Sequence, residues 1–236
     1  MIPLHDDNPT RIRPVVTIAL IVSCVLVFLW QVSHPPRVGQ ALVFVYGMIP
    51  AVLTGKASLP PELAVIPPEL TVFTSMFMHG GWMHLIGNML YLWIFGNNVE
   101  DSMGHGRFLV FYLLCGVLAA LAQTLTDPAS EIPMVGASGA ISGVLGAYLL
   151  LYPHARVLVA FPIGFYLWTE YLPAGLVLGL WFIFQLLSSA FTDTSGGGVA
   201  FMAHIGGFVA GMALIPLFKH PQVRFFNPPR PPLADR

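Results

Sequence analysis

A serine and a histidine stand in two separate apolar runs of the chain, and together they could form a nucleophile and its base. Ser138 lies in the stretch GASGAISGVLGAY, and His204 lies in AHIGGFVAG. A serine hydroxyl is a poor nucleophile unless a neighbouring base takes its proton, and an imidazole is the commonest such base. The pair therefore predicts nucleophilic catalysis, provided that the fold brings the two side chains together.

The neighbouring residues could stabilise the negative charge that develops on a substrate carbonyl oxygen. The backbone N–H of Ser138, the side-chain amide of Asn88 and the ring of His84 are candidate donors for such an oxyanion. His84 and Asn88 are four positions apart, so both lie on one face of a helix. Gly136 and Gly139 flank the serine and would let a substrate backbone come close, so we expect them to bind substrate.

The composition indicates that a lipid bilayer is the solvent for most of the chain. Of its 236 residues, 56% are hydrophobic and only 9% are charged, and the mean hydropathy is +0.76. A soluble domain of this length needs more charge to cover its surface. The net charge of -1 gives no reason to expect nucleic acid as a partner. Cys24 and Cys115 stand in separate apolar runs and predict buried side chains rather than a disulfide or metal site.

Six apolar runs predict an all-α membrane protein, because each has roughly the 20 residues that a membrane-spanning helix needs. The predicted spans are residues 15–32, 82–99, 108–126, 135–152, 172–189 and 199–218. They form one domain, 15–218, between a cytoplasmic N-terminal segment, 1–14, and a disordered cytoplasmic tail, 219–236. The polar, proline-rich N-terminus lacks a signal-peptide pattern, so we expect the first span to be retained.

Two connections are harder to interpret. The long first loop, 33–81, contains proline pairs and short apolar pieces, and we expect it to be interfacial or partly inserted. The segment 157–171 is apolar and aromatic but is broken by Pro162, and we expect it to lengthen the fourth or the fifth span.

The positive-inside rule orients the bundle. A cytoplasmic N-terminus places eight of the ten Lys and Arg residues on the inner side. The second, fourth and sixth spans then run inward from the outer surface, and His84, Asn88, Ser138 and His204 all lie roughly 5–12 Å below their outer ends. A polar cluster at one membrane depth is a functional-site hypothesis by default. We therefore expect an active site that opens to the outer face.

Small residues at four-residue spacing predict which helices meet. Gly139, Gly143 and Ala147 repeat along the fourth span, and Ala203, Gly207 and Gly211 repeat along the sixth. Such stripes let two helix backbones approach closely in a membrane. Ser138 and His204 stand next to these stripes, so the predicted contact would press them together.

At these residues the chain resembles the rhomboid family of intramembrane serine proteases. The resemblance rests on HGGWMHLIGNMLYLWIFGNNVED, GASGAISGVLGAY and AHIGGFVAG, in this order and spacing. It implies a six-helix rhomboid-like bundle and a Ser138–His204 dyad without a third carboxylate, a cofactor or a metal. It also implies substrates that are single-pass transmembrane proteins in contact with membrane lipid, cut near their outer ends. The fifth span and the loop 191–198 would form a gate and cap.

One departure from the family concerns the histidine. Some members have a tyrosine four residues after the serine, stacked on the catalytic imidazole, and Ser142 stands there in this chain. The resemblance therefore leaves open how His204 is oriented. With no organelle-targeting feature in the sequence, we expect the plasma (inner) membrane of a bacterium.

Two other classes of function stay open. His79, His84 and His204 could bind a metal or handle protons in a transporter, although the chain has no H-E-x-x-H motif and no acidic residue at that depth. The alternative closest to the protease is a catalytically inactive rhomboid-like protein that binds transmembrane clients. Glu100 and Asp101 are expected to be structural, either capping the third span or pairing with Arg107.

Overall fold

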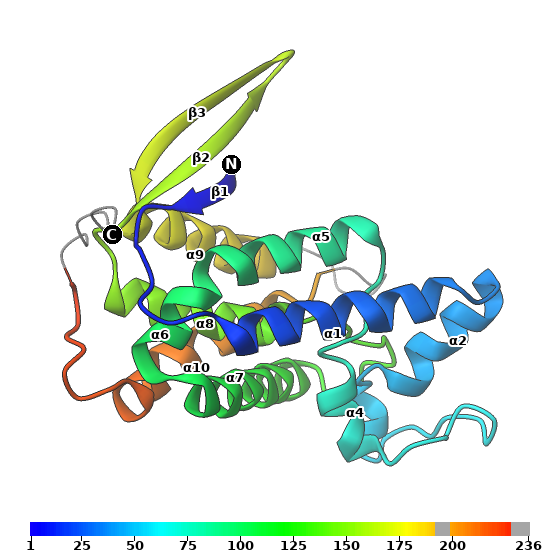
Figure 1. The fold of residues 1–236 in the computed structure, drawn as a ribbon. Helices are drawn as coiled ribbons and strands as arrows, with labels where there is room; N and C mark the ends of the chain where they lie inside the picture. Colours follow the sequence, from blue (N-terminus) through cyan, green and yellow to red (C-terminus); the bar gives the residue numbers. More distant parts are fainter. Residues whose placement is uncertain (192–198, 228–236) are drawn as a thin grey trace.

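The computed structural model describes residues 1–191 and 199–227, and most of these residues are helical (Figure 1). Among them, four helices are long and apolar enough to cross a membrane: α1 (Val15–Val32), α7 (His105–Thr126), α9 (Ala174–Phe191) and α10 (Phe201–Phe218). The other elements, in chain order, are β1 (Ile2–Asp6), α2 (Pro36–Tyr46), α3 (Pro50–Leu53), α4 (Pro68–Thr74), α5 (Trp82–Tyr91), η1 (Leu92–Gly96), α6 (Asn97–Met103), α8 (Ser138–Leu151), β2 (Arg156–Ile163) and β3 (Tyr166–Pro173). The predicted gate loop falls largely on residues 192–198, outside the described part of the chain.

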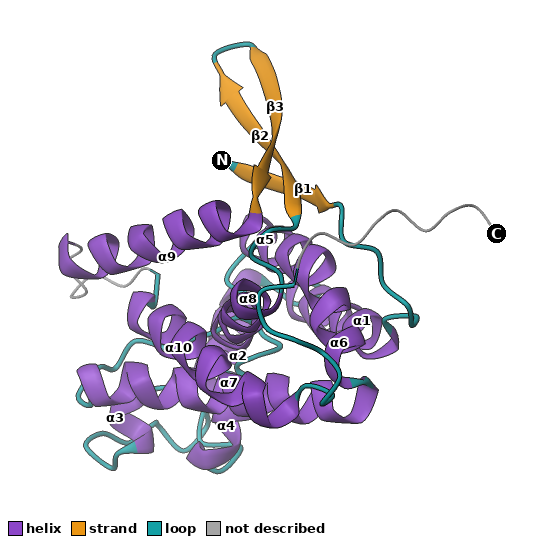
Figure 2. Ribbon diagram, turned by 90° about the vertical axis from the view of Figure 1, so that its left-hand side faces the viewer, coloured by secondary structure: helices purple, strands orange, loops and turns teal. Residues whose placement is uncertain are grey.

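Two helical stretches stand where the sequence predicts the second and fourth spans. Residues 82–103 are helical without a break, because the π-helical turn η1 joins α5 to α6. Helix α8 has only 14 residues. It lies in the middle of the bundle, where the longer helices surround it (Figure 2).

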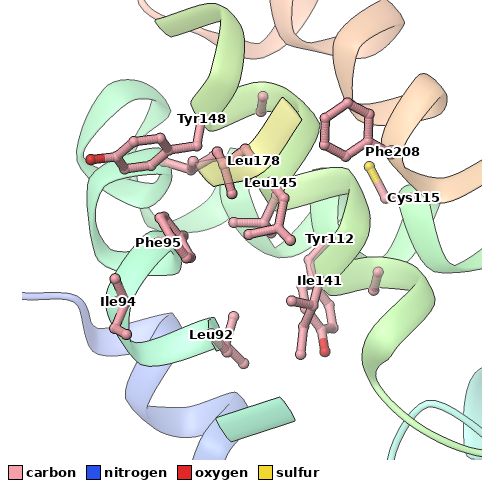
Figure 3. Packing of buried hydrophobic residues seen from close by; sticks show 14 of the residues in the cluster. Leu92, Ile94, Phe95, Tyr112, Cys115, Ile141, Leu145, Tyr148, Leu178 and Phe208 are labelled. Carbon is pink, nitrogen blue, oxygen red and sulfur yellow. The ribbon is translucent and has the colours of Figure 1, made fainter. Parts of the chain in front are cut away.

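The hydrophobic core is built around α8. Ile141, Leu145 and Tyr148 of this helix point into a cluster that also contains Phe95 and Phe208, which come from η1 and α10 (Figure 3). Ten of the 14 residues of α8, all of them in the described part of the chain, are buried. Its length is therefore set by packing against protein rather than by contact with lipid.

Helices α8 and α10 approach closely through glycines. A Cβ added to Gly207 would overlap the carbonyl oxygen of Gly139, and one added to Gly211 would overlap that of Gly143. No larger residue fits there without separating the two helices. The predicted contact between these two small-residue stripes is confirmed.

A three-stranded antiparallel sheet at one end of the bundle overturns the prediction of an all-α fold. Its order is β1-β2-β3, so the N-terminal segment pairs with a strand more than 150 residues later in the chain. The expectation that residues 157–171 lengthen a neighbouring helix was wrong, because they form most of the β2–β3 hairpin.

The local sequence explains the hairpin. A short apolar run rich in β-branched and aromatic residues fits a strand as well as a buried helix, and periodicity alone does not separate the two. Gly164 has a φ of +59° at the first position of the two-residue loop, as a tight hairpin turn requires. Pro162 lies beyond the segment that pairs with β1, so its missing N–H costs no ladder bond on that edge.

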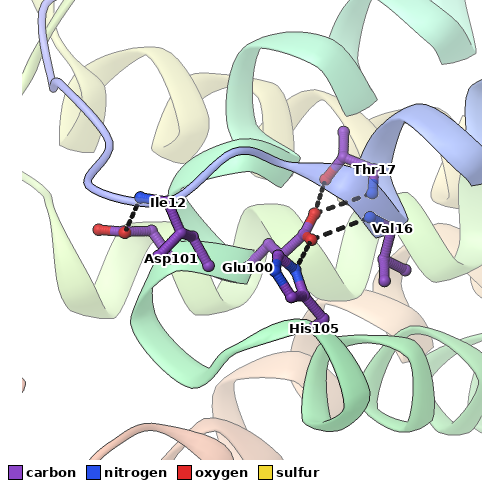
Figure 4. Close-up of polar contacts among 6 residues, drawn as sticks. All are labelled: Ile12, Val16, Thr17, Glu100, Asp101 and His105. Atoms are coloured by element: carbon purple, nitrogen blue, oxygen red, sulfur yellow. Dashed lines mark hydrogen bonds and ion pairs between the residues drawn. The ribbon is translucent and has the colours of Figure 1, made fainter.

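Glu100 joins the start of α1 to the start of α7, and Asp101 binds the backbone just before α1 (Figure 4). The fully buried Glu100 carboxylate accepts hydrogen bonds from the backbone N–H groups of Val16 and Thr17, at 2.9 and 2.8 Å, and from the Thr17 hydroxyl at 2.7 Å. His105 Nδ1, from the first residue of α7, lies 2.5 Å from Oε1, the oxygen that also binds Val16. A carboxylate at a helix N-terminus satisfies donors that have no partner within the helix.

The first loop is tied to the segment that leads into α8. Met48 and Met134 exchange two backbone hydrogen bonds, and the N–H of Gly136 donates to the carbonyl of Ser75 at 2.9 Å. These bonds fix the backbone just before Ser138.

The first residues of the chain after α10 are also held in place: the backbone N–H groups of Phe226 and Asn227 donate hydrogen bonds to the carbonyls of Leu150 and Leu151, both at 2.9 Å. Residues 228–236 of the predicted tail lie outside the described residues.

Candidate active site

The side chains of Ser138 and His204 meet in the structure. Ser138 is the first residue of α8, and His204 lies in the first turn of α10. The distance between Ser138 Oγ and His204 Nε2 is 2.8 Å. Sixty-six positions separate them in the chain, so their contact depends on the glycine packing of α8 against α10.

The other ring nitrogen of His204 is held by a residue of α9. Gln185 Oε1 lies 2.8 Å from His204 Nδ1. An amide oxygen only accepts hydrogen bonds, so the ring proton is on Nδ1 and the lone pair is on Nε2. This tautomer leaves Nε2 free to take the proton of the Ser138 hydroxyl.

The sequence alone predicts no role for Gln185 at the site. The signal for such a role was an isolated amide in the apolar run 172–191. Nothing in the spacing could place it opposite His204, because that position depends on how α9 is rotated against α10. Gln185 is only 5% exposed, although most of α9 is open.

Aromatic side chains complete the support of the imidazole. The ring of Trp181 lies 6.0 Å from that of His204, and the ring of Phe201 lies 6.5 Å away. Ser142, at the position of the family's stacking tyrosine, instead donates its hydroxyl to the carbonyl of Ser138 at 2.7 Å. Besides its bond to Ser138, the His204 ring is therefore oriented by side chains of α9 and α10 rather than by the residue at position 142.

A cavity of about 820 Å³ surrounds the pair. Its walls include all six residues that the sequence suggested for the site: His84, Asn88, Gly136, Ser138, Gly139 and His204. Trp181 and Gln185 line the same cavity. This space is large enough for an extended peptide segment beside the serine.

Two side chains of α5 present donors to this cavity. The N–H of Gly80 donates to His84 Nδ1 at 3.3 Å, so the ring proton of His84 is on Nε2, where it can be donated. The Asn88 side chain is buried, and its Nδ2 has no hydrogen-bond partner among the described residues. A buried amide without a partner is costly, so a ligand oxygen would satisfy it. The first N–H groups of α8, beginning at Ser138, are the third source of donors.

The backbone conformation and the packing around Ser138 both require glycine, at positions 136 and 139 respectively. Gly136 has a φ of +125°, which residues with a side chain rarely adopt, and a Cβ there would lie 2.7 Å from the His84 ring. A Cβ on Gly139 would lie 2.7 Å from the Cβ of Ala119, at the contact between α8 and α7. Both residues line the cavity, and their predicted contact with substrate remains a prediction.

His79 lies behind the site in the loop before α5. Its ring is fully buried, 5.2 Å from that of His84, and Nδ1 lies 3.2 Å from the carbonyl of Phe77. Burial lowers the pKa of the His79 imidazole to about 4, so this ring is neutral at neutral pH. Within residues 1–191 and 199–227, no three His, Cys, Asp or Glu side chains gather where they could hold a metal ion.

Comparison with known proteins gives one consistent result. The family model for the rhomboid domain matches residues 68–221, which are well over half of the chain. The chain is similar to Rhomboid protease GluP of Bacillus subtilis, with 37% identity over 145 residues, covering 61% of this chain and 25% of that protein. It is 32% identical over 160 residues to RHOMBOID-like protein 5 of Arabidopsis thaliana, covering 66% and 47%.

A third relative comes from a mitochondrion. Rhomboid protein 1, mitochondrial, of Saccharomyces cerevisiae is 28% identical over 152 residues, covering 62% of this chain and 41% of that protein. The chain thus spans less than half the length of each of these three relatives. The residues that the family model matches include Ser138, His204 and every residue that lines the cavity except Pro50.

Proposed function

The chain belongs to the rhomboid family of membrane proteins, and from this premise we propose that it is an intramembrane serine endopeptidase with Ser138 and His204 as its catalytic dyad. The observation that carries the proposal is the 2.8 Å contact between Ser138 Oγ and His204 Nε2 inside a large cavity. Relatives named as proteases, among them GluP, support peptide-bond hydrolysis.

The chemistry follows from the tautomer of His204. Nε2 takes the proton of Ser138 as Oγ attacks the carbonyl carbon of a substrate peptide bond. The resulting imidazolium gives this proton to the leaving nitrogen, and an acyl-enzyme remains on Oγ. Water then attacks the ester with the same imidazole as base, which releases the second product and restores the serine. Gln185 keeps Nδ1 protonated and directs Nε2 to the serine throughout.

The oxyanion of each tetrahedral intermediate is bound by donors around the start of α8. Asn88 Nδ2, His84 Nε2 and the backbone N–H of Ser138 take this role in the proposal. The unpartnered state of Asn88 Nδ2 supports it, since a preorganised donor needs no rearrangement as charge develops. Removing one such donor typically costs about 10²–10³-fold in kcat.

The remaining parts of the proposal concern the membrane. Six helical stretches, with α5–α6 and α8 added to the four long helices, cross the bilayer. The N- and C-termini lie in the cytoplasm, and the cavity opens to the outer face of the plasma membrane. Substrates are single-pass transmembrane proteins that enter from the lipid and unwind near their outer ends. The basic residues at one end of the bundle support this orientation.

The test uses the purified full chain in lipid nanodiscs with a substrate that carries one transmembrane helix and a helix-breaking segment near its outer end. Wild type should cleave it with and without a chelator. Ser138→Ala and His204→Ala should each lower kcat by about 10³-fold or more, because neither half of a nucleophile–base pair works alone. Ser142→Ala, a matched loss of a hydroxyl one turn away, should stay within about threefold of wild type.

Two outcomes would contradict the proposal. Cleavage that survives Ser138→Ala would remove this residue as the nucleophile. If wild type neither cleaves nor reacts with a fluorophosphonate probe for activated serine, the chain is instead an inactive rhomboid-like protein that binds transmembrane clients.

A further inference from the structure

The β2–β3 hairpin is the most exposed apolar part of the described chain. It rises from the end of the bundle and points away from the helices (Figures 1 and 2). Residues 157–169 contain no charged residue. Near its tip Phe165, Tyr166 and Trp168 are 107%, 83% and 60% exposed. Water is an unfavourable environment for such a surface, which would aggregate in a soluble protein.

The strand register separates the hairpin into two faces. Val157 and Val159 lie on one face and are fully buried against the bundle at the base of the hairpin. Side chains two positions apart share a face, and so do directly paired residues of antiparallel strands. The pairs Phe161–Trp168 and Ile163–Tyr166 therefore continue the same face beyond the pair Val159–Glu170, which carries the one charged side chain on this face of the described hairpin.

This apolar face joins the lipid-facing surface of α9. Helix α9 begins at Ala174, immediately after β3. Its outer side carries large exposed apolar side chains, among them Leu180, Ile183 and Phe184. The exposed apolar surface of α9 and the aromatic face of the hairpin thus belong to one continuous stretch of chain, with Glu170 as the charged residue between them.

The end of the bundle that carries the sheet is also basic. We define the basic end by six residues: Arg11, Arg13, Arg107, Arg156, Lys219 and Arg224. They flank the starts of α1, α7 and β2 and follow the end of α10, which lie at the same end in Figure 1. Five of them are exposed, and Lys219 is half-buried. Anionic lipid headgroups complement such a cluster.

We propose that the β2–β3 hairpin is a lipid-binding anchor that lies in the bilayer interface next to the basic end. Phe161, Ile163, Tyr166 and Trp168 point toward the acyl chains, and the opposite face points to water. Trp and Tyr favour this interfacial depth because their rings are apolar and their polar atoms can reach water. The anchor rests on the membrane location of the chain and not on its proteolytic activity.

The anchor would hold the first residues of α9 in a fixed position relative to the membrane surface. Interfacial aromatic and basic residues set the tilt and rotation of the helices attached to them. Because β3 continues directly into α9, the hairpin fixes the end of α9 that lies far from Gln185. The opposite end of α9 carries no comparable support among the described residues.

The test compares neighbouring residues on opposite faces of β3. Single-cysteine variants Trp168→Cys and Thr169→Cys are spin-labelled in the full chain and placed in nanodiscs of phosphatidylcholine with phosphatidylglycerol. Power saturation then measures access to oxygen, which concentrates in lipid, and to a water-soluble nickel chelate. Native Cys24 and Cys115 are buried, and the unsubstituted chain gives the background signal. Tyr166→Cys and Leu167→Cys form a second pair in case one variant does not fold.

The anchor predicts opposite accessibilities within each pair. The labels at 168 and 166 should be reached by oxygen at least about threefold more, relative to nickel, than those at 169 and 167. Nickel access at all four positions would place the hairpin in water and overturn the proposal. Dipolar broadening between labels, with both reagents excluded, would identify a second copy as the occupant and would equally overturn it.

Discussion

Helices α8 and α9 both contribute to the candidate active site, but they are held in very different ways. Ten of the 14 residues of α8 are buried, whereas α9 buries four of its 18 described residues. Three of these four lie at its start, so Gln185 is the only buried residue of α9 beyond Leu178. The nucleophile thus stands on a largely buried helix, and the partner of its base stands on a helix that is mostly outside the protein core.

This difference has a consequence for access to the site. The stacking of Phe182 on Phe208 at 4.5 Å and the bond from Gln185 to His204 hold the middle of α9 to α10. An outward displacement of α9 would widen the cavity and break the bond to His204 at once. Under the proposed function, entry of a substrate from the lipid past α9 would therefore be coupled to the orientation of His204.

The largest expected loss of stability and activity comes from a substitution at the contact between α8 and α10. Gly211→Val would place a branched side chain against the backbone of Gly143, which cannot move without separating the helices. We expect a loss of about 3 kcal/mol or more in stability and of nearly all activity, because overpacking against backbone is poorly relieved. Thermal unfolding in detergent and cleavage of the test substrate measure the two effects.

Gly179→Val supplies the matched control on α9. A Cβ at Gly179 has no other atom within 4 Å, so the same substitution there fills open space. It should change stability by less than about 1 kcal/mol. Equal losses for the two variants would show that α8 and α9 do not differ in packing as the structure indicates.

The hydrogen bond between Gln185 and His204 joins α9 to the proposed catalytic base. Gln185→Met keeps the length of the side chain but removes the acceptor for His204 Nδ1. We expect kcat to fall about 10- to 100-fold with KM nearly unchanged, since a lost hydrogen bond to the base corresponds to about 1.4–2.8 kcal/mol. Gln185→Glu restores an acceptor and should recover most of the loss.

A substitution of Gln123 tests whether Gln185 acts by orienting the His204 ring or only by packing two helices together. Its Oε1 accepts a hydrogen bond from the backbone N–H of Ala203 at 3.2 Å, so it also joins a neighbouring helix to α10 but does not bind the His204 ring. Gln123→Met should therefore lower kcat by less than about threefold. A loss as large as that of Gln185→Met would show that both amides act by packing, as would failure of Gln185→Glu to recover activity.

The helices that face lipid could be predicted well from the sequence. The first span matches α1 at both ends, and the sixth matches α10 at its end, because the bilayer demands a long apolar run and the polar flanks delimit it. The meeting of Ser138 with His204 was also predictable, since glycine spacing and common depth both depend on local sequence. Their catalytic roles remain predictions.

The parts that the sequence did not reveal depend on lateral arrangement. The sheet was not predicted for two reasons. Residues 157–171 are too short and too apolar a segment for hydrophobic periodicity to distinguish a strand from a helix. The strand β1 that pairs with β2 also lies about 150 residues earlier in the chain. The carboxylate of Glu100 contacts His105 at the start of α7, where it was expected, and also binds the start of α1, which is distant in the chain. Likewise, nothing local determines that Gln185 faces His204.

The smallest predicted effect lies at the other end of α8, where the sheet holds it. The Asp6 carboxyl accepts hydrogen bonds from Tyr148 Oη at 2.5 Å and from Asn98 Nδ2 at 2.9 Å. Burial is the largest influence and raises the pKa of Asp6 from 3.8 to about 6, although the bond from Tyr148 opposes this rise. The folded chain therefore binds this proton more tightly than the unfolded chain does.

The sign of the pH dependence follows from that difference. The contribution of protonated Asp6 to the free energy of unfolding is fully present below about pH 4 and is lost as the pH rises toward 6. Above the folded-state pKa of about 6, the free energy of unfolding no longer changes with the titration of Asp6. Asp6→Asn cannot ionise, so the melting temperature of wild type minus that of Asp6→Asn should fall by a few degrees between pH 4 and 6.5. A difference that stays flat would mean that α8 is held by its glycine contacts alone, and the contrast with α9 would then rest entirely on the interface with α10.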